Sequence, residues 1–229
     1  MKTYTLWLEP TSRAHELLAT TIAHLSQEHG GPLFDPHVTL LGDIAGQEET
    51  VLQQTEQLAN ALSPLDLILT VPAFQDQYFQ CIFMRIEETS TLLDAHAHAR
   101  TVFHKEAVPP FMPHVSLLYG LDPPSLKEQI SGTLPASLSV QFTASVVTVF
   151  QVEGNSPNDW HKVQTFSFRG HGIQQAAGSD GIQVAHDLLH DMPFQHLPQL
   201  THQDRSRRDR APCYPHSPVY APSSVCSFY

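Results

Sequence analysis

A histidine followed two positions later by a hydroxyl residue occurs twice in the chain, each time within the same flanking sequence. His37 and Thr39 lie in the stretch PLFDPHVTLL at positions 32–41, and His114 and Ser116 lie in PPFMPHVSLL at positions 109–118. Eight of the ten positions match when threonine and serine are counted together. A match of this length, including both prolines before the histidines, indicates an internal duplication.

The two copies together supply groups that can cleave a phosphodiester. Near neutral pH one imidazole can accept a proton from water while another donates a proton to a leaving oxygen. We therefore predict that His37 and His114 are catalytic. Hydroxyl groups can donate hydrogen bonds to phosphate oxygens, so Thr39 and Ser116 are predicted to bind the substrate, with no metal and no cofactor. A symmetric repeat does not distinguish base from acid; our starting assignment makes His114 the base.

Each copy is expected to present its side chains from a short β-strand. The residues after each Pro-His pair are β-branched or apolar, and proline is tolerated at the start of a strand. Side chains two positions apart share one face of a strand, so each imidazole projects with its hydroxyl while the alternate Val and Leu residues face the core. If the copies lie side by side about a pseudo-twofold axis, the four groups surround one small volume.

The elements around these strands are repeated as well. The two histidines are 77 positions apart, and the same offset relates two further pairs of elements. A strand expected at 4–8 corresponds to one at 81–86, and a helix expected from Ser12 to the Gly30-Gly31 stop corresponds to one at 91–106. Further helices are expected at 48–62 and 125–130, and further strands at 65–71, 78–86, 137–152 and 160–168. The repeated unit of strand, helix and strand predicts two equivalent lobes.

Charge and composition restrict the classes of partner. The formal net charge is −11, and most of the acidic excess lies before Gly170, so we do not expect long nucleic acid as a partner. The sequence shows no signal-peptide layout and no apolar run long enough to span a bilayer. We expect a monomeric cytoplasmic protein that acts on a small molecule and binds no membrane. The three cysteines, Cys81, Cys213 and Cys226, show no pairing or metal-binding pattern.

The composition changes after Gly170. Residues 171–229 are rich in Gln, His, Pro, Ser and Gly, with a basic cluster at Arg205, Arg207, Arg208 and Arg210. Such a segment cannot bury enough apolar surface to offset its chain entropy. We therefore divide the chain into a folded domain at 1–170, whose lobes exchange segments near 43–80 and 120–170, and a disordered low-complexity tail at 171–229.

Other residues that could do chemistry are weighed against structural roles. Tyr119 follows Ser116 by three positions, and we predict that it contacts the substrate, against the alternative of a core tyrosine. Trp7 and Trp160 could stack a base, but burial in the core is favoured. The helical histidines are not expected to bind zinc, because their spacing or context does not assemble a ligand set; these are His96, His98, His104, His186 and His190.

The two motifs resemble those of the two-histidine phosphoesterase superfamily, and within it the plant and fungal cyclic phosphodiesterase family. The resemblance rests on residues 34–39 and 111–120, on the opening Leu-Trp-Leu-Glu-Pro at 6–10, and on Trp-His-Lys-Val at 160–163. It covers most of 1–170. It implies an α+β, bilobal fold with two pseudo-twofold-related antiparallel sheets, flanked by helices, beside a central cleft.

The resemblance also implies a reaction. Family members hydrolyse ADP-ribose 1″,2″-cyclic phosphate, a by-product of tRNA splicing, to ADP-ribose 1″-phosphate, and open nucleoside 2′,3′-cyclic phosphates to 2′-phosphates. By motif match, His37 and His114 are the acid-base pair, Thr39 and Ser116 hold the phosphate, and Tyr119 contacts the substrate. Three alternatives remain open: an RNA-end 2′,3′-cyclic phosphodiesterase of the same superfamily, an inactive nucleotide-binding module, and a metal-dependent hydrolase.

Overall fold

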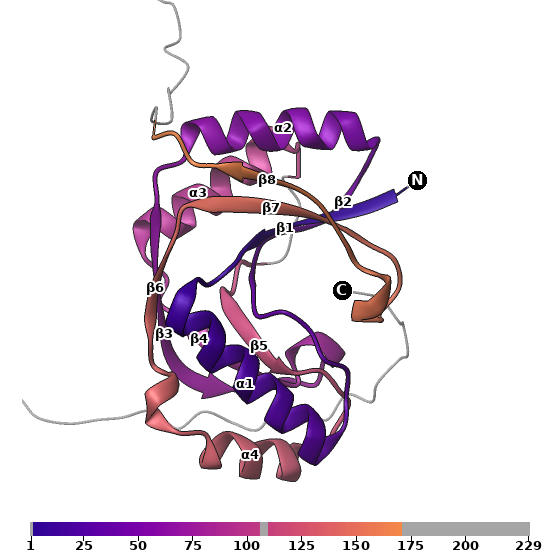
Figure 1. Ribbon diagram of the computed structural model, residues 1–229, viewed down its shortest axis with the longest axis vertical. Helices are drawn as coiled ribbons and strands as arrows, with labels where there is room; N and C mark the ends of the chain where they lie inside the picture. Colours follow the sequence, from indigo (N-terminus) through magenta and orange to yellow (C-terminus); the bar gives the residue numbers. More distant parts are fainter. Residues whose placement is uncertain (1, 106–109, 171–229) are drawn as a thin grey trace, which may run out of the picture. The chain divides into compact units, whose positions relative to one another are not determined.

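Eight antiparallel strands form one curled sheet in the computed structural model, which describes residues 2–105 and 110–170 (Figure 1). The strand order is β6-β3-β4-β5-β2-β1-β7-β8. The strands are β1 (Lys2–Leu8), β2 (Val38–Gly46), β3 (Leu65–Ala73), β4 (Ile82–Ile86), β5 (His114–Leu118), β6 (Gln141–Ala144), β7 (Val146–Val152) and β8 (His161–Ser167). The helices are α1 (Ser12–His29), α2 (Glu48–Ala61), α3 (Ser90–Val102) and α4 (Pro124–Thr133).

The sheet consists of two four-stranded halves that meet at β2 and β5. One half has the order β2-β1-β7-β8 and the other β5-β4-β3-β6, so equivalent strands occupy equivalent places on either side of the junction. The α+β fold with two related antiparallel sheets is therefore confirmed. The described residues lie in one unit, 1–179, and the tail predicted to be disordered at 171–229 lies outside them.

The helix of each copy packs on the histidine strand of the other copy. α1 contacts β5, and α3 contacts β2. α1 buries the stripe Ala14, Leu18, Ile22 and Leu25. The residues that alternate with the predicted site residues along β2 and β5 are fully buried; these are Val38, Leu40, Val115 and Leu117. The helix-covered face of the sheet is thus the core, and the other face of β2 and β5 carries the histidines.

Several element boundaries differ from the sequence prediction. A 3₁₀ turn at Tyr78–Gln80 precedes β4, because the backbone N–H of Gln75 donates to the carbonyl of Gln80 and closes a loop. α3 ends at Val102, and His104 adopts a φ of +52°, which does not continue a helix. The segment 137–152, expected to form one long strand or two paired strands, forms two strands, β6 and β7, which are divided at Ser145 and pair with different halves of the sheet. None of the helices in residues 2–105 and 110–170 could cross a membrane.

Gly31, between α1 and β2, lies close to the end of β5. Its φ is +92°, and an added Cβ would lie 2.7 Å from the Tyr119 carbonyl oxygen. We expect Gly31→Ala to lower the free energy of unfolding in urea by about 1–3 kcal/mol, because the left-handed backbone and the contact both oppose a side chain. Gly132→Ala in α4 is the control, since its Cβ would meet nothing within 4 Å. Equal stability of the wild type and Gly31→Ala would contradict the described backbone.

Candidate active site

The register between β2 and β5 brings the four repeated side chains onto one face of the sheet. Val38 lies directly opposite Val115 in the antiparallel pair. Continuing this register by one residue on each side sets His37 opposite Ser116 and Thr39 opposite His114. Directly opposed residues point to the same face, and neighbouring residues alternate, so the four side chains lie together on the face opposite the buried valines. His37 and Ser116 are 9% and 7% exposed, whereas Thr39 and His114 are half-buried.

Both imidazole rings are oriented by the same backbone contact. Nδ1 of His37 lies 2.7 Å from the Asp35 carbonyl oxygen, and Nδ1 of His114 lies 2.8 Å from the Met112 carbonyl oxygen. A carbonyl oxygen only accepts hydrogen bonds, so Nδ1 carries the hydrogen in each ring. The lone pair of each neutral imidazole is then on Nε2, which can accept or donate a proton at the site.

The ring of His37 lies in a buried, aromatic environment. The Trp7 ring stacks on it with centroids 3.5 Å apart and planes inclined by 8°, and Phe150 stacks on the Trp7 ring at 3.7 Å. Burial lowers the pKa of His37 to about 4. The Asp35 carbonyl and the charge of Glu9 raise this pKa, while a positive charge on His114 lowers it further. His37 is therefore neutral at physiological pH.

His114 is placed between β4 and β2 on the same face. The Phe83 ring meets it edge-on with centroids 5.1 Å apart. Burial lowers the pKa of His114, and the hydrogen bond to the Met112 carbonyl opposes that shift. The strand register places His114 and His37 on the same face, and a positive charge on His114 lowers the pKa of His37.

Ser116 and Tyr119 lie near each other and near the loop before β4. The Ser116 hydroxyl donates to the Phe79 carbonyl oxygen at 2.7 Å, so it must rotate before it can donate to a phosphate. Tyr119 is 3% exposed, lies near the Ser116 side chain and stacks on Phe34 with centroids 3.7 Å apart. Burial raises the pKa of Tyr119, so its hydroxyl stays protonated. Tyr119 thus has the burial of a core residue and lies near a predicted site residue.

Aromatic side chains gather at the Tyr119 end of the site. The half-buried Trp160 ring has its centroid 5.7 Å from that of Trp7, 5.9 Å from Phe79 and 6.1 Å from Tyr119. The core position predicted for Trp7 agrees with its burial, but its stack on His37 was not anticipated.

Glu9 is a charged neighbour of His37 that the motif comparison missed. Its carboxylate accepts hydrogen bonds from Thr148 at 2.5 Å and Lys162 at 3.1 Å. The available signal was its position two residues after Trp7, immediately after the end of β1, the strand that pairs with β2.

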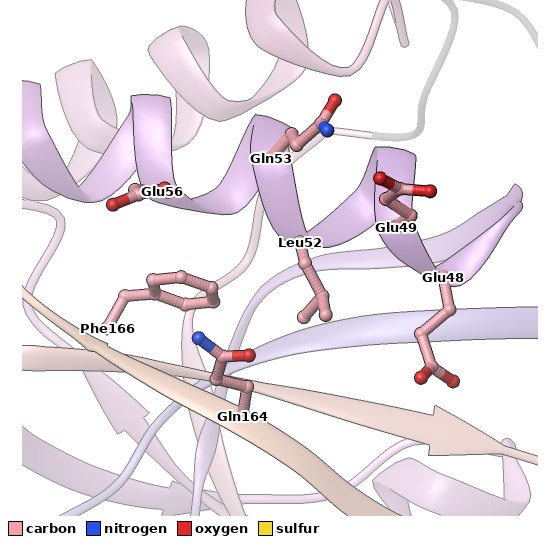
Figure 2. A pocket seen from close by; sticks show the side chains of 7 residues that line it. All are labelled: Glu48, Glu49, Leu52, Gln53, Glu56, Gln164 and Phe166. Carbon is pink, nitrogen blue, oxygen red and sulfur yellow. The ribbon is translucent and has the colours of Figure 1, made fainter.

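A separate hollow lies between α2 and β8 and contains none of the predicted site residues. Its volume is about 260 Å³, and Figure 2 shows the Leu52 side chain of α2 pointing toward the strand that carries Gln164 and Phe166. The lining residues are Glu48, Glu49, Leu52, Gln53, Glu56, Gln164 and Phe166. Three glutamates make this hollow unsuitable for a phosphate, which the electrostatic repulsion would exclude.

Known proteins share this fold. A structure of Escherichia coli LigT complexed with 3′-AMP has a TM-score of 0.51 and 12% identity, covering 73% of this chain and 98% of that one. A protein of Thermus thermophilus has a TM-score of 0.55 and 17% identity, covering 74% of this chain and 99% of that one. At these identities the likeness shows the fold alone.

Sequence comparison reaches a family. The cyclic phosphodiesterase of Arabidopsis thaliana is 26% identical over 116 residues, which are 51% of this chain and 64% of that protein. The family described as "Cyclic phosphodiesterase-like protein" matches residues 1–167, which contain both histidine motifs and all eight strands. The resemblance inferred from the two motifs is therefore confirmed, and the chain belongs to the cyclic phosphodiesterase-like family of two-histidine phosphoesterases.

Proposed function

We propose that this chain hydrolyses cyclic phosphates by acid-base catalysis between His37 and His114, without a metal ion. The observation that carries the proposal is the register of β2 and β5, which sets two Nε2 atoms and two hydroxyls on one sheet face. Membership of the cyclic phosphodiesterase-like family supports the same reaction class.

The proposed reaction adds one water molecule across a P–O bond. A neutral imidazole removes a proton through Nε2 from the attacking water, whose oxygen forms a new bond to phosphorus. The bond from phosphorus to one ribose oxygen breaks, and the second, protonated imidazole donates its proton to that oxygen. Thr39 and, after rotation, Ser116 donate hydrogen bonds to the non-bridging oxygens, where charge increases in the transition state.

The surroundings of the rings favour His37 as the base, the reverse of our starting assignment. A base must be neutral before the reaction, and the pKa of His37 is lowered to about 4 by burial and by the charge of His114. His114 then serves as the acid. Its pKa is also lowered in the empty site, but a bound phosphate anion favours its protonated form.

The proposed substrates are ADP-ribose 1″,2″-cyclic phosphate, giving ADP-ribose 1″-phosphate, and nucleoside 2′,3′-cyclic phosphates, giving nucleoside 2′-phosphates. The name of the Arabidopsis relative supports a cyclic phosphodiester. The aromatic side chains near Tyr119 offer surfaces on which a base can stack, and the net charge of −11 disfavours long nucleic acids over small molecules. We further propose that the protein acts as a monomer in the cytoplasm.

Removal of either imidazole should abolish turnover. We expect His37→Ala and His114→Ala each to lower kcat on a nucleoside 2′,3′-cyclic phosphate by at least about 10²-fold, because each proton transfer contributes that much. Thr39→Ala and Ser116→Ala should lower kcat by about 10-fold to 10²-fold, as each removes one donor to the phosphate. The exposed His24→Ala in α1 is the matched control. Wild-type activity should persist in excess EDTA; near-normal rates from either catalytic variant would reject the mechanism.

The pH dependence of kcat/KM should report the two imidazoles of the free enzyme. Activity needs His37 neutral and His114 protonated, so kcat/KM should fall as pH drops through the His37 pKa of about 4. The pKa of His114 lies below the ordinary histidine value of 6.5, so kcat/KM should also fall as rising pH removes the proton from His114. The optimum is therefore expected below pH 6.5. NMR titration, assigned with His37→Gln, should match the acid limb to His37. An optimum above about pH 6.5, or an acid limb that follows His114, would contradict the assignment.

A further inference from the structure

Arg85 lies beside His114 on the face of the sheet that carries the site. In the pairing of β4 with β5, Arg85 is directly opposite His114 and Phe83 is opposite Ser116. Directly opposed side chains point to the same face. The edge contact between the Phe83 and His114 rings shows that β4 side chains of this face meet the site.

The guanidinium group of Arg85 is available for a new partner. Its Nη2 is 3.8 Å from the Glu88 carboxylate, and the two side chains are 46% and 50% exposed. Such a solvated pair contributes little, whereas a guanidinium can bind a phosphate through two parallel hydrogen bonds. Lys162 pairs directly with Phe150 of β7, which places it on the same face of the sheet. It lies at the other side of the sheet, however, and its ammonium group is held by the Glu9 carboxylate at 3.1 Å.

Arg85 and the aromatic side chains lie at opposite ends of the site. Tyr78 and Phe79 precede β4 and contact Tyr119, at the end of β5, while Arg85 lies near the end of β4 and opposite the first residue of β5. A ribose 2′,3′-cyclic phosphate carries its base on C1′ and its 5′ substituent on C4′, the two carbons that flank the ring oxygen, so the two groups extend in different directions. A base stacked at the aromatic end therefore directs the 5′ substituent away from that end.

We propose that Arg85 forms a second phosphate subsite, which selects cyclic phosphates that bear a phosphate or pyrophosphate on the 5′ carbon of the same ribose. This inference rests on the proposed function and specifies its substrate class. The reacting cyclic phosphate is held between the histidines, and the 5′ group replaces Glu88 as the partner of the guanidinium.

The test compares one nucleoside 2′,3′-cyclic phosphate with and without a 5′-phosphate, and its readout is the ratio of the two kcat/KM values. The wild-type enzyme should prefer the 5′-phosphorylated substrate by about tenfold, as expected for a charge-assisted hydrogen bond. Arg85→Gln should bring this ratio close to one. Glu88→Gln should increase the ratio, because it removes the competing carboxylate. Arg13→Gln, an exposed arginine in α1, is the matched control and should keep the wild-type ratio.

A ratio that is unchanged in Arg85→Gln would overturn the subsite. An equal loss on both substrates would also overturn it, because Arg85 would then act on the cyclic phosphate or on folding. If the wild type hydrolyses neither substrate, the proposed function fails, and calorimetric binding of the same two compounds decides the subsite separately. A wild-type affinity advantage for the 5′-phosphorylated compound that Arg85→Gln removes supports it, and equal affinities overturn it.

Discussion

The register pair between Val38 and Val115 sets His37, Thr39, His114 and Ser116 on one face of the sheet. Strand side chains alternate, so a slip of one residue would turn the histidine of one strand into the core and its valine to the site. The fully buried Val38, Leu40, Val115 and Leu117 oppose that slip, because exposing them would lose the free energy of their burial. α1 packs on β5 and α3 packs on β2, so the helix of each copy covers the buried residues in the histidine strand of the other copy.

The same junction explains the chemistry of the two imidazoles. His37 immediately precedes β2 and His114 begins β5, and in each copy the carbonyl two residues before the histidine accepts from Nδ1. Both Nε2 atoms are thereby left for the substrate. Burial lowers both pKa values, but the surroundings differ, since Trp7 stacks on His37 and Phe83 meets His114 edge-on. A duplicated backbone thus holds two groups that can do opposite tasks.

Much of this arrangement could be predicted from the sequence, because it depends on local patterns. The repeat predicted equivalent strands and helices, and alternation predicted that His37 and Thr39 share a face. The roles of the site residues remain predictions. What could not be predicted depends on pairing between distant strands: the contact of Arg85 with the His114 position, the charge of Glu9 near His37, and the Phe79 carbonyl that takes the Ser116 hydroxyl. The 3₁₀ turn before β4 depends on a loop closure that no periodic pattern encodes.

The central claim is that two imidazoles from duplicated strands act on one phosphate. A crystal structure of the wild-type chain with a bound nucleoside 2′,3′-cyclic vanadate, which mimics the five-coordinate transition state, tests it most directly. The account predicts one vanadium centre whose oxygens lie within hydrogen-bonding distance of Nε2 of both His37 and His114. A vanadate that contacts only one of these atoms, or that binds elsewhere on the chain, would contradict it.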